Sequence, residues 1–509
     1  MSRSRLKTFW TLAGAAMALG AVAQAQDKYI TTELTAGSGR ESRAYAINKI
    51  GQVVGLVDTG DTLHASLWFN GAETDLHKTS HLDLQLIFTA DHGEAFNISD
   101  AGQVVGTAWT VINCPDTDWT VTHGFLLRPA TLSDLGTPFP GDALADFWTF
   151  GSPCFVYNSA ATAVSNRNHV VGWAAADGGI IRAFLVTPKN GTWFVDTAPA
   201  DQVNDNMINL GTFDGQGVES SATDVNDDGL VTGYTYLNPS DPTTTTAYHA
   251  FLVTPLDTDF DQIGDTWAAD LDADGGNDLM SDLGTLGGNN SWGRGINNSN
   301  QVVGESDTAD LNVHAFMWSN GSMIDLGTLG GDNSSAASID DLGRVVGWAE
   351  TANGDRHACL WVDNKPYDLN SLTLNKLSIV LTEARDINSS GEIVGWGVVK
   401  GDETNTPQAF SMRLASDAEI AAAEESETPT TTPTTDPNDS NSGGGSGNNP
   451  NNPLDLDPLF PGQPSTTPVD GNGFTTDPLP STCGIGTGGL LPLALGIGFV
   501  ALSRRRRWA

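Results

Sequence analysis

The stretch GINNSNQVVGESDTADLNVHAFMWSNGSMIDLGTLGG, residues 295–331, decides the fold because the chain repeats it. A second nearly uninterrupted copy, SIDDLGRVVGWAETANGDRHACLWVDNKPYDL, covers residues 338–369. The other five copies share the core, which reads AINKIGQVVG (46–55), NISDAGQVVG (97–106), AVSNRNHVVG (163–172), DVNDDGLVTG (224–233) and DINSSGEIVG (386–395). The shortest intervals between the final glycines of these cores give a unit of about 45 residues, a period typical of a four-stranded propeller blade.

Each unit offers four short β-strands joined by Asn-Gly-type turns, as at Asn320-Gly321. Strands rich in β-branched and aromatic residues between such turns indicate hairpins, and no segment shows helical periodicity. We therefore predict an all-β chain, a seven-bladed β-propeller over residues 28–414 built from four-stranded repeats. A linear β-solenoid is the alternative.

The two ends of the repeat array complement each other. The seventh copy ends with QAFSMRL (408–414) and has no fourth strand, whereas YITTELTAGSG near the N-terminus is similar to MIDLGTLGG of the fifth copy. Leu34 precedes Ile47 by the same interval that separates Leu326 from Ile339. The N-terminal strand is therefore predicted to complete the last blade, which closes the ring without an exposed edge.

The composition excludes several classes of protein. The 509 residues carry 62 acidic and 24 basic side chains, a formal net charge of -38, which argues against nucleic acid as a partner. Four cysteines are too few for a disulfide-dense miniprotein, and no long apolar run interrupts the repeats. We expect a monomeric, turn-rich β protein.

The terminal segments have the features of targeting signals. Residues 1–25 combine basic residues, an apolar stretch and a small-x-small site ending at Ala25, which predicts a secretory signal peptide. Residues 417–482, rich in Thr, Pro, Gly and Asn, predict a disordered linker. Residues 483–509 form a short apolar segment followed by four arginines, which predicts a membrane contact.

This last segment resembles bacterial C-terminal sorting signals, which combine a Gly-rich or Cys-Gly motif, a short apolar helix and an arginine cluster. The resemblance implies processing near Cys483 or near Gly488 and Gly489, and display at the cell surface or outer envelope. A permanent tail anchor is the alternative.

The triplets His249-Ala250-Phe251 and His314-Ala315-Phe316, together with the DLGTLGG runs at 282–288 and 325–331, resemble the HAF family of extracellular repeats. The resemblance implies an exported bacterial repeat protein and brings no established activity. The repeated histidines stand once per blade at one strand position, which separates them around the ring. They are therefore predicted to be hydrogen-bonding residues of the fold, with no metal role.

The fourth blade has an acidic insertion with regularly spaced carboxylates. Such a cluster favours a hard cation, and Ca²⁺ takes six to eight oxygen ligands. The loop resembles thrombospondin-type calcium repeats and, more loosely, an EF-hand loop, although Gln262 replaces the turn glycine of its first half. We predict structural calcium, with the metal ligands Asp257, Asp259, Asp261, Asp265, Asp270, Asp272, Asp274 and Asp278. A merely solvated acidic loop is the alternative.

Cys114 and Cys154 lie in two insertions of the second blade, on connections that alternate strands place on one face. Export permits a disulfide between them, which we predict. We expect the insertions on this face to form the contact surface, because binding residues often lie on loops of a rigid scaffold.

No nucleophile elbow, zinc-protease or phosphate-loop motif is present in the sequence. The leading interpretation is a non-enzymatic binding or adhesion module for a glycan, a protein or a small-molecule ligand. A secreted carbohydrate-active enzyme, hydrolase or lyase, is the alternative, since propellers host many chemistries. A purely structural envelope protein is a third possibility.

Overall fold

The repeats form seven four-stranded antiparallel sheets in the computed structural model of the chain. Blade 1 contains β2 (Ser42–Ile47), β3 (Val53–Asp58), β4 (Leu63–Phe69) and β5 (Ala72–Asp75). Blade 2 contains β6 (Gly93–Ile98), β7 (Val104–Asn113), β8 (Asp118–Leu127) and β9 (Leu144–Phe147). Blade 3 contains β10 (Ser159–Val164), β11 (Val170–Ala175), β12 (Ile181–Val186) and β13 (Met207–Asn209).

The second half of the ring repeats the same order. Blade 4 contains β14 (Ser220–Val225), β15 (Val231–Leu237), β16 (Ala247–Val253) and β17 (Met280–Asp282). Blade 5 contains β18 (Gly287–Ile296), β19 (Val302–Thr308), β20 (Val313–Ser319) and β21 (Ser322–Asp325). Blade 6 contains β22 (Gly330–Ile339), β23 (Val345–Thr351), β24 (Arg356–Val362) and β25 (Lys365–Asp368). Blade 7 contains β26 (Ile379–Ile387), β27 (Ile393–Val399), β28 (Pro407–Leu414) and β1 (Tyr29–Leu34).

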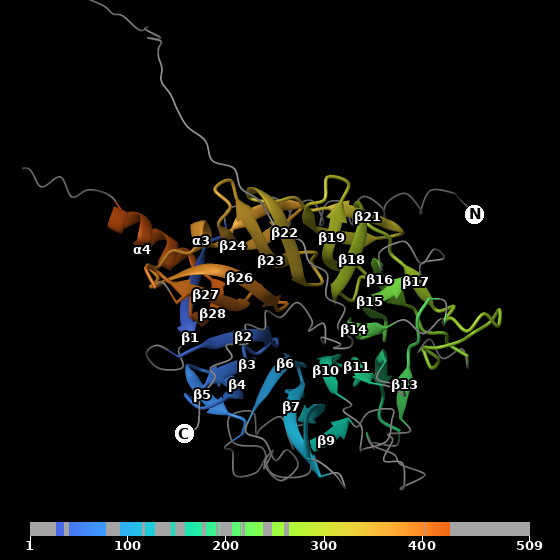
Figure 1. The fold of residues 1–509 in the computed structure, drawn as a ribbon. Coiled ribbons are helices and arrows are strands. Elements are labelled where there is room, and N and C mark those ends of the chain that lie inside the picture. The colour runs from blue at the N-terminus through green and yellow to red at the C-terminus, as the bar shows by residue number, and fades with distance from the viewer. Residues whose placement is uncertain are drawn as a thin grey trace, which may run out of the picture. The chain divides into compact units, whose positions relative to one another are not determined.

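The blades follow one another around a common centre, with β2, β6, β10, β14, β18, β22 and β26 innermost (Figure 1). Each innermost strand contacts the innermost strand of the next blade, and β2 contacts β26, so the ring is closed. The predicted seven-bladed β-propeller is therefore confirmed.

The N-terminal strand completes the last blade as predicted. β1 pairs antiparallel with β28, with Tyr29 opposite Leu414 and Leu34 opposite Ala409. Tyr29 is buried, and its backbone carbonyl accepts the N–H of Leu374 at 2.9 Å. The last blade thus joins the two ends of the folded chain.

The structure describes residues 27–34, 40–77, 92–113, 118–127, 144–147, 158–175, 180–189, 193, 206–213, 215, 219–237, 247–258, 264–402 and 404–427. Residues 428–509 lie outside the described residues. Within the described ranges no helix is long and apolar enough to cross a membrane.

Apolar residues of neighbouring blades form the core. The phenylalanine of the His-Ala-Phe triplet, as at Phe251 and Phe316, is fully buried, and Cys359 fills the same position in blade 6. The second-strand glycine leaves room for this ring, since a Cβ on Gly304 would lie 3.0 Å from Phe316 and 1.9 Å from the Trp292 carbonyl oxygen. The repeated Val-Val-Gly and His-Ala-Phe motifs are therefore packing requirements of a blade.

Serines in the innermost strands connect consecutive blades. The Oγ of Ser334 in blade 6 accepts the N–H of Ala315 at 2.9 Å and donates to the Gly327 carbonyl at 2.7 Å, both in blade 5. The same N–H acceptor role recurs at four other junctions, through Ser42, Ser159, Ser220 and Ser291. We call these five residues the junction serines.

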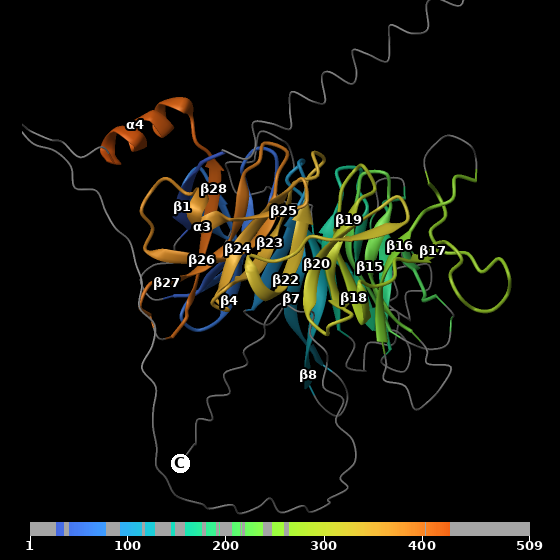
Figure 2. The ribbon, with the colours of Figure 1, turned by 90° about the horizontal axis from the view of Figure 1, so that it is seen from above.

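Two helices depart from the all-strand prediction. A single turn, α3 (Leu369–Leu372), follows blade 6, and α4 (Asp417–Glu427) begins directly after β28, beside blade 7 (Figure 2). The disordered linker predicted from residue 417 is thus wrong for its first eleven residues. Ser416 and Glu419 form a capping box, in which the N–H of Ser416 donates to Glu419 Oε2 at 2.9 Å, and an alanine-rich segment follows.

Candidate functional site

One β-bulge occurs at the same place in every innermost strand. A bulge leaves one residue without a partner on the neighbouring strand and re-aims its side chain, and bulges are frequent beside functional sites. Because the other edge of each innermost strand is unpaired, these bulges line the centre of the ring. The seven bulged residues are Tyr45, Phe96, Thr162, Thr223, Arg294, Ala337 and Arg385.

In blades 3 and 4 the bulged residues have a structural role. Thr162 Oγ1 donates to the Ala222 carbonyl at 3.0 Å, and Thr223 Oγ1 donates to the Gly293 carbonyl at 2.9 Å. Each hydroxyl thus binds the innermost strand of the next blade. The bulged residues of blades 5, 7, 1 and 2 are instead arginines and aromatic residues, namely Arg294, Arg385, Tyr45 and Phe96.

Tyr45 is the centre of an aromatic group that joins blades 7, 1 and 2. Its ring meets Phe96 of blade 2 edge-on at 5.9 Å and Trp396 of blade 7 at 5.8 Å. The guanidinium carbons of Arg43 and Arg385 lie 5.3 and 5.6 Å from the centre of the Trp396 ring. These contacts place two arginines within cation–π range of one aromatic ring.

Two more arginines extend this group across blades 5 and 6. Arg294 forms an ion pair with Glu305, and Arg356 forms one with Glu383, which also lies 3.1 Å from Arg385 Nη1. The Cζ of Arg356 stands 4.0 Å from the centre of the Trp348 ring. The charges of these residues act on one another. We call Arg43, Arg294, Arg356 and Arg385 the channel arginines.

The channel arginines are short of acceptors. Their carboxylate partners are Glu41, Glu305 and Glu383, so four guanidinium groups share three carboxylates. The Nε atoms of Arg294 and Arg385 are buried and have no hydrogen-bond acceptor among the described residues. In a chain with a net charge of -38, this group thus has one more guanidinium than paired carboxylates, and two buried N–H donors without acceptors among the described residues. Such a place favours an anionic group.

Glu94 adds a carboxyl group of unusual acidity. It is buried, and its Oε2 accepts the hydroxyl of Tyr45 at 3.2 Å. Burial raises the pKa of Glu94 to about 7, although the Tyr45 hydrogen bond and the Arg43 charge act in the opposite direction. At neutral pH this carboxyl group is therefore able both to donate and to accept a proton.

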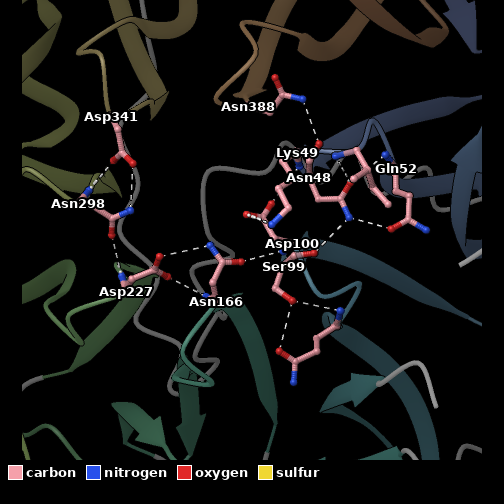
Figure 3. A network of polar contacts seen from close by, with 12 residues as sticks. Asn48, Lys49, Gln52, Ser99, Asp100, Asn166, Asp227, Asn298, Asp341 and Asn388 are labelled. Atoms are coloured by element: carbon pink, nitrogen blue, oxygen red, sulfur yellow. Dashed lines mark hydrogen bonds and ion pairs between the residues drawn. The ribbon is translucent and has the colours of Figure 1, made fainter. Parts of the chain in front are cut away.

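One end of the ring carries a belt of hydrogen bonds between blades (Figure 3). It lies in the turns that follow the innermost strands, and we call it the turn belt. In each step a backbone N–H donates to a side-chain oxygen of the next blade at 2.8 to 3.0 Å, through Lys49, Asp100, Asn166, Asp227, Asn298 and Asp341 in order.

Asparagine side chains reinforce the turn belt. Asn388 Nδ2 of blade 7 donates to the Asn48 carbonyl at 3.0 Å, and Asn48 Nδ2 donates to the Ser99 carbonyl at 3.2 Å (Figure 3). The turns surround a cavity of about 210 Å³. Since the belt oxygens already accept backbone N–H groups, the belt is primarily a device that holds the blades together.

The structure brings part of the predicted calcium site together. Carboxylate oxygens of Asp270, Asp272 and Asp278 lie within 4.8 Å of one another on an exposed loop, which projects from blade 4 (Figure 2). Gly275 has the positive φ that the turn requires, +94°. Buried Asn277 anchors the loop, because its Nδ2 donates to the Leu210 carbonyl at 2.8 Å.

The remaining predicted ligands do not join this group. Asp274 Oδ1 accepts the N–H of Gly276 at 2.7 Å, and Asp265 Oδ2 accepts the Thr258 hydroxyl at 2.6 Å. Asp257 is described but does not belong to the convergent set, whereas Asp259 and Asp261 lie outside the described residues. Three carboxylates thus remain as candidate calcium ligands.

The repeated histidines bind the fourth strand of their own blades. Nδ1 of His249, His314 and His357 lies 2.7 to 2.9 Å from the carboxylate of Asp282, Asp325 and Asp368 respectively. The hydrogen-bonding role predicted for them is present, with an aspartate of the neighbouring strand as the partner. His64 pairs in the same way with Asp75, and His77 joins these two, an association that the prediction missed.

Several predicted residues cannot be compared with the structure. Ala25, Cys114, Cys154, Cys483, Gly488 and Gly489 lie outside the described residues, so the disulfide and the processing sites stay predictions. Cys359 is buried, which raises the pKa of its thiol well above the usual value.

The channel arginines were not predicted from the sequence. Arg43, Arg294 and Arg385 do share a signal, since each lies two to four residues before the Ile-Asn pair of its copy. Their meeting depends on ring closure and on the bulges, which local sequence does not specify. The insertions expected to form the contact surface lie largely outside the described residues.

The solved structures to which the chain is similar show no more than general likeness. TolB from Acinetobacter baumannii is 12% identical, with 72% of this chain and 80% of TolB covered and a TM-score of 0.31. A Trypanosoma rangeli sialidase is 11% identical, with 65% and 54% covered and a TM-score of 0.31. The fucose-binding Aleuria aurantia lectin, a six-bladed β-propeller, is 9% identical, with 63% and 92% covered and a TM-score of 0.29. TM-scores this low support no conclusion about function.

No curated protein matches the chain. The family described as "Protein of unknown function (DUF3466)" matches residues 131–409, which is more than half of the sequence and includes every strand from β9 to β27. The chain belongs to the DUF3466 family.

Proposed function

We propose that this propeller is a binding module that takes an anionic ligand at the channel arginines. The observation that carries the proposal is the grouping of Arg43, Arg294, Arg356 and Arg385 in so acidic a chain. Two of their buried Nε donors have no acceptor in the part of the chain that the structure describes. Guanidinium groups recognise carboxylate, sulfate or phosphate through charge-assisted hydrogen bonds.

The aromatic residues beside the arginines favour a sugar acid as this ligand. Trp348 and Trp396, both half-buried, place aromatic rings next to the guanidinium groups. A saccharide that carries a carboxylate combines an apolar ring face with an anionic group, and therefore fits both features. The overall negative charge would disfavour long polyanions and favour short or sparsely charged chains.

A screen of acidic and neutral oligosaccharides on the purified folded protein tests the proposal. We expect saturable binding of one or more acidic members and a loss of at least about ten-fold in affinity in Arg385→Gln, because a charge-assisted hydrogen bond contributes about 1.5–3 kcal/mol. Arg413→Gln is the matched control, since Arg413 pairs with Glu419 at the edge of α4. Failure of every acidic member to bind would overturn the proposal.

A second candidate is glycoside cleavage, and the observation that favours it is Glu94. A carboxyl group with a pKa of about 7 can act as a general acid at neutral pH, and it lies beside Tyr45. Turnover of an acidic oligosaccharide that is lost in Glu94→Gln would favour this candidate. Saturable binding without product would exclude it.

We also propose that structural Ca²⁺ binds the exposed loop of blade 4 through Asp270, Asp272 and Asp278. The support is the convergence of their carboxylate oxygens and the positive φ of Gly275. Hard cations prefer such oxygen ligands. The ion would stabilise the loop and take no part in catalysis.

Export and surface display are proposals that rest on the terminal segments. Residues 1–25 support a cleaved signal peptide, and residues 483–509 support membrane contact and sorting. N-terminal sequencing of the protein recovered from the cell surface tests the first, with a mature N-terminus after Ala25 as the expected result. A retained Met1 on the surface protein would contradict it.

A further inference from the structure

The clearest unexplained group lies at the junction of blades 1 and 2. Three side chains meet there, His64 of β4, Asp75 of β5 and His77, which follows two residues after Asp75. Each offers a ligand atom, and these atoms lie within 4.8 Å of one another. We propose that His64, Asp75 and His77 bind a transition metal ion, with Zn²⁺ as the expected ion.

The group is a modification of a motif that the other blades also contain. In blades 4 and 5 the aspartate that pairs with the repeated histidine also accepts the N–H of a glycine two residues later, Gly284 or Gly327. In blade 1 the same turn is kept, with the N–H of His77 donating to Asp75 Oδ1 at 2.9 Å. Blade 1 thus adds a second imidazole to an existing His–Asp pair.

The second imidazole occupies space that a junction serine fills elsewhere. The first residue of β6 is Gly93, where five other blades have serine. A Cβ added to Gly93 would lie 3.0 Å from Cε1 and Nε2 of His77. At this one junction, Gly93 therefore replaces the junction serine, and His77 replaces the glycine that follows the aspartate in blades 4 and 5. Together these two differences place the His77 ring beside His64.

Burial distinguishes this group from the other His–Asp pairs. His64 and His77 are buried, and their rings stack with centroids 4.5 Å apart. The side chain of His64 is 2% exposed, compared with 18% to 22% for His249, His314 and His357. The side chain of Asp75 is 18% exposed to solvent, which offers an ion a route to the group.

The donor set has the chemistry of a zinc site. Two imidazoles and one carboxylate are common Zn²⁺ ligands, and a fourth position would take water. Nδ1 of His64 lies 2.8 Å from Asp75 Oδ2, so a metal ion would replace the proton that these atoms share. His64 Nε2 lies 3.0 Å from Thr62 Oγ1, a contact that would orient the ring as outer partners of metal-bound histidines do.

Another blade junction points to a purely structural role for His77, which the experiment must distinguish from metal binding. At the junction of blades 6 and 7, Asn370 stands at the position of His77, and its side chain binds the backbone of Leu381 through Oδ1 and Nδ2, each at 2.9 Å. His77 could similarly serve only to join two blades. Binding of a metal, and not stability alone, therefore has to be measured.

The experiment is a titration of the metal-free full chain with Zn²⁺ against a competing chromophoric chelator. Excess Ca²⁺ is present throughout so that the acidic loop of blade 4 does not contribute. The double variant His77→Gly with Gly93→Ser recreates the glycine and serine of the other junctions. His77→Asn, which copies Asn370, is the second variant if the double variant does not fold.

We expect one equivalent of Zn²⁺ to bind the wild-type protein, and a loss of affinity of at least about ten-fold in the folded variants. Co²⁺ should give visible absorption in the wild-type protein alone, and His314→Gln should bind like wild type. Absence of Zn²⁺ binding to the wild-type protein overturns the proposal. Equal affinity in a folded His77 variant overturns it as well.

Discussion

The carboxylate of Asp386 in blade 7 accepts the backbone N–H of Ile47 in blade 1, with an Oδ2 to N distance of 2.9 Å. Asp224 of blade 4 binds the N–H of Ile296 in the same way at 2.9 Å, and Asn97 of blade 2 binds that of Val164 at 3.3 Å. Blades 2, 4 and 7 thus each use one side chain to hold the innermost strand of the next blade. At the last junction this bond works together with the pairing of β1 and β28.

Deletion of β1 is expected to destabilise the whole ring. The strand supplies the outer edge of blade 7, buries Tyr29 and pairs with β28 along its length. Its removal would expose an unpaired edge and part of the core. Calorimetry should show a clearly lower melting temperature for a chain without residues 27–34. A chain without α4 is the control, and equal melting temperatures for the deletion and the intact chain would refute ring closure by β1.

Asp224 makes stability depend on pH. Burial raises its pKa to about 7, although the N–H groups of Ile296 and Val225 act in the opposite direction. Because the folded pKa exceeds the unfolded value, this carboxyl group favours folding below about pH 4 and loses that contribution as pH rises toward 7. Asp224→Asn should therefore raise the free energy of unfolding at pH 8, on the order of 1–3 kcal/mol.

Asn97 shows that an amide can fill this position, since its Oδ1 makes the equivalent bond. Urea unfolding of wild type and Asp224→Asn at pH 5 and pH 8 measures the effect. The gain should be smaller at pH 5. A gain that is larger at pH 5 than at pH 8 would show that Asp224 is buried as a carboxylate.

Calcium is expected to raise the melting temperature of the protein. Asp270, Asp272 and Asp278 repel one another without a cation, and Ca²⁺ would replace this repulsion with coordination. Differential scanning calorimetry with Ca²⁺ and with EGTA should show an increase in wild type and none in Asp272→Asn with Asp278→Asn. Asp310→Asn, at an exposed site in blade 5, is the control. No response of the wild-type protein would exclude a structural ion.

The junction serines should contribute measurably to stability. In Ser334→Ala, the N–H of Ala315 loses its acceptor and the Gly327 carbonyl loses a donor. Buried groups left without partners cost about 1–3 kcal/mol each. Urea unfolding should show a loss of that order, against almost none for Ser322→Ala, which is exposed. Equal stabilities for the two variants would contradict the role assigned to Ser334.

The repeat pattern was sufficient to predict the ring, because each blade is a local hairpin unit. Seven cores that end in Val-Val-Gly, Val-Thr-Gly or Ile-Val-Gly, together with a spare N-terminal strand, predicted the number of blades and their closure. Leu34 lies opposite Ala409 as that closure requires. The helix α4 was missed because its helical segment is short and precedes a Thr- and Pro-rich stretch.

The candidate site could not be predicted in the same way. Arg294 and Arg385 are 91 positions apart in the sequence. In the folded ring the charges of both act on the guanidinium group of Arg356. The bulges that place them shift the strand register by one residue, and no local signal marks them. The group of His64, Asp75 and His77 was not predicted, because the space for the His77 ring depends on Gly93, which belongs to the next blade.

The central claim is that the channel arginines recognise an anionic group. The most direct measurement compares, by isothermal titration, an acidic oligosaccharide that binds with the same oligosaccharide after reduction of its carboxyl groups to alcohols. Wild type should bind the acid at least about ten-fold more tightly, and Arg385→Gln should bind both forms about equally. Equal binding of the two forms by the wild-type protein, or an undiminished preference in Arg385→Gln, would contradict the account.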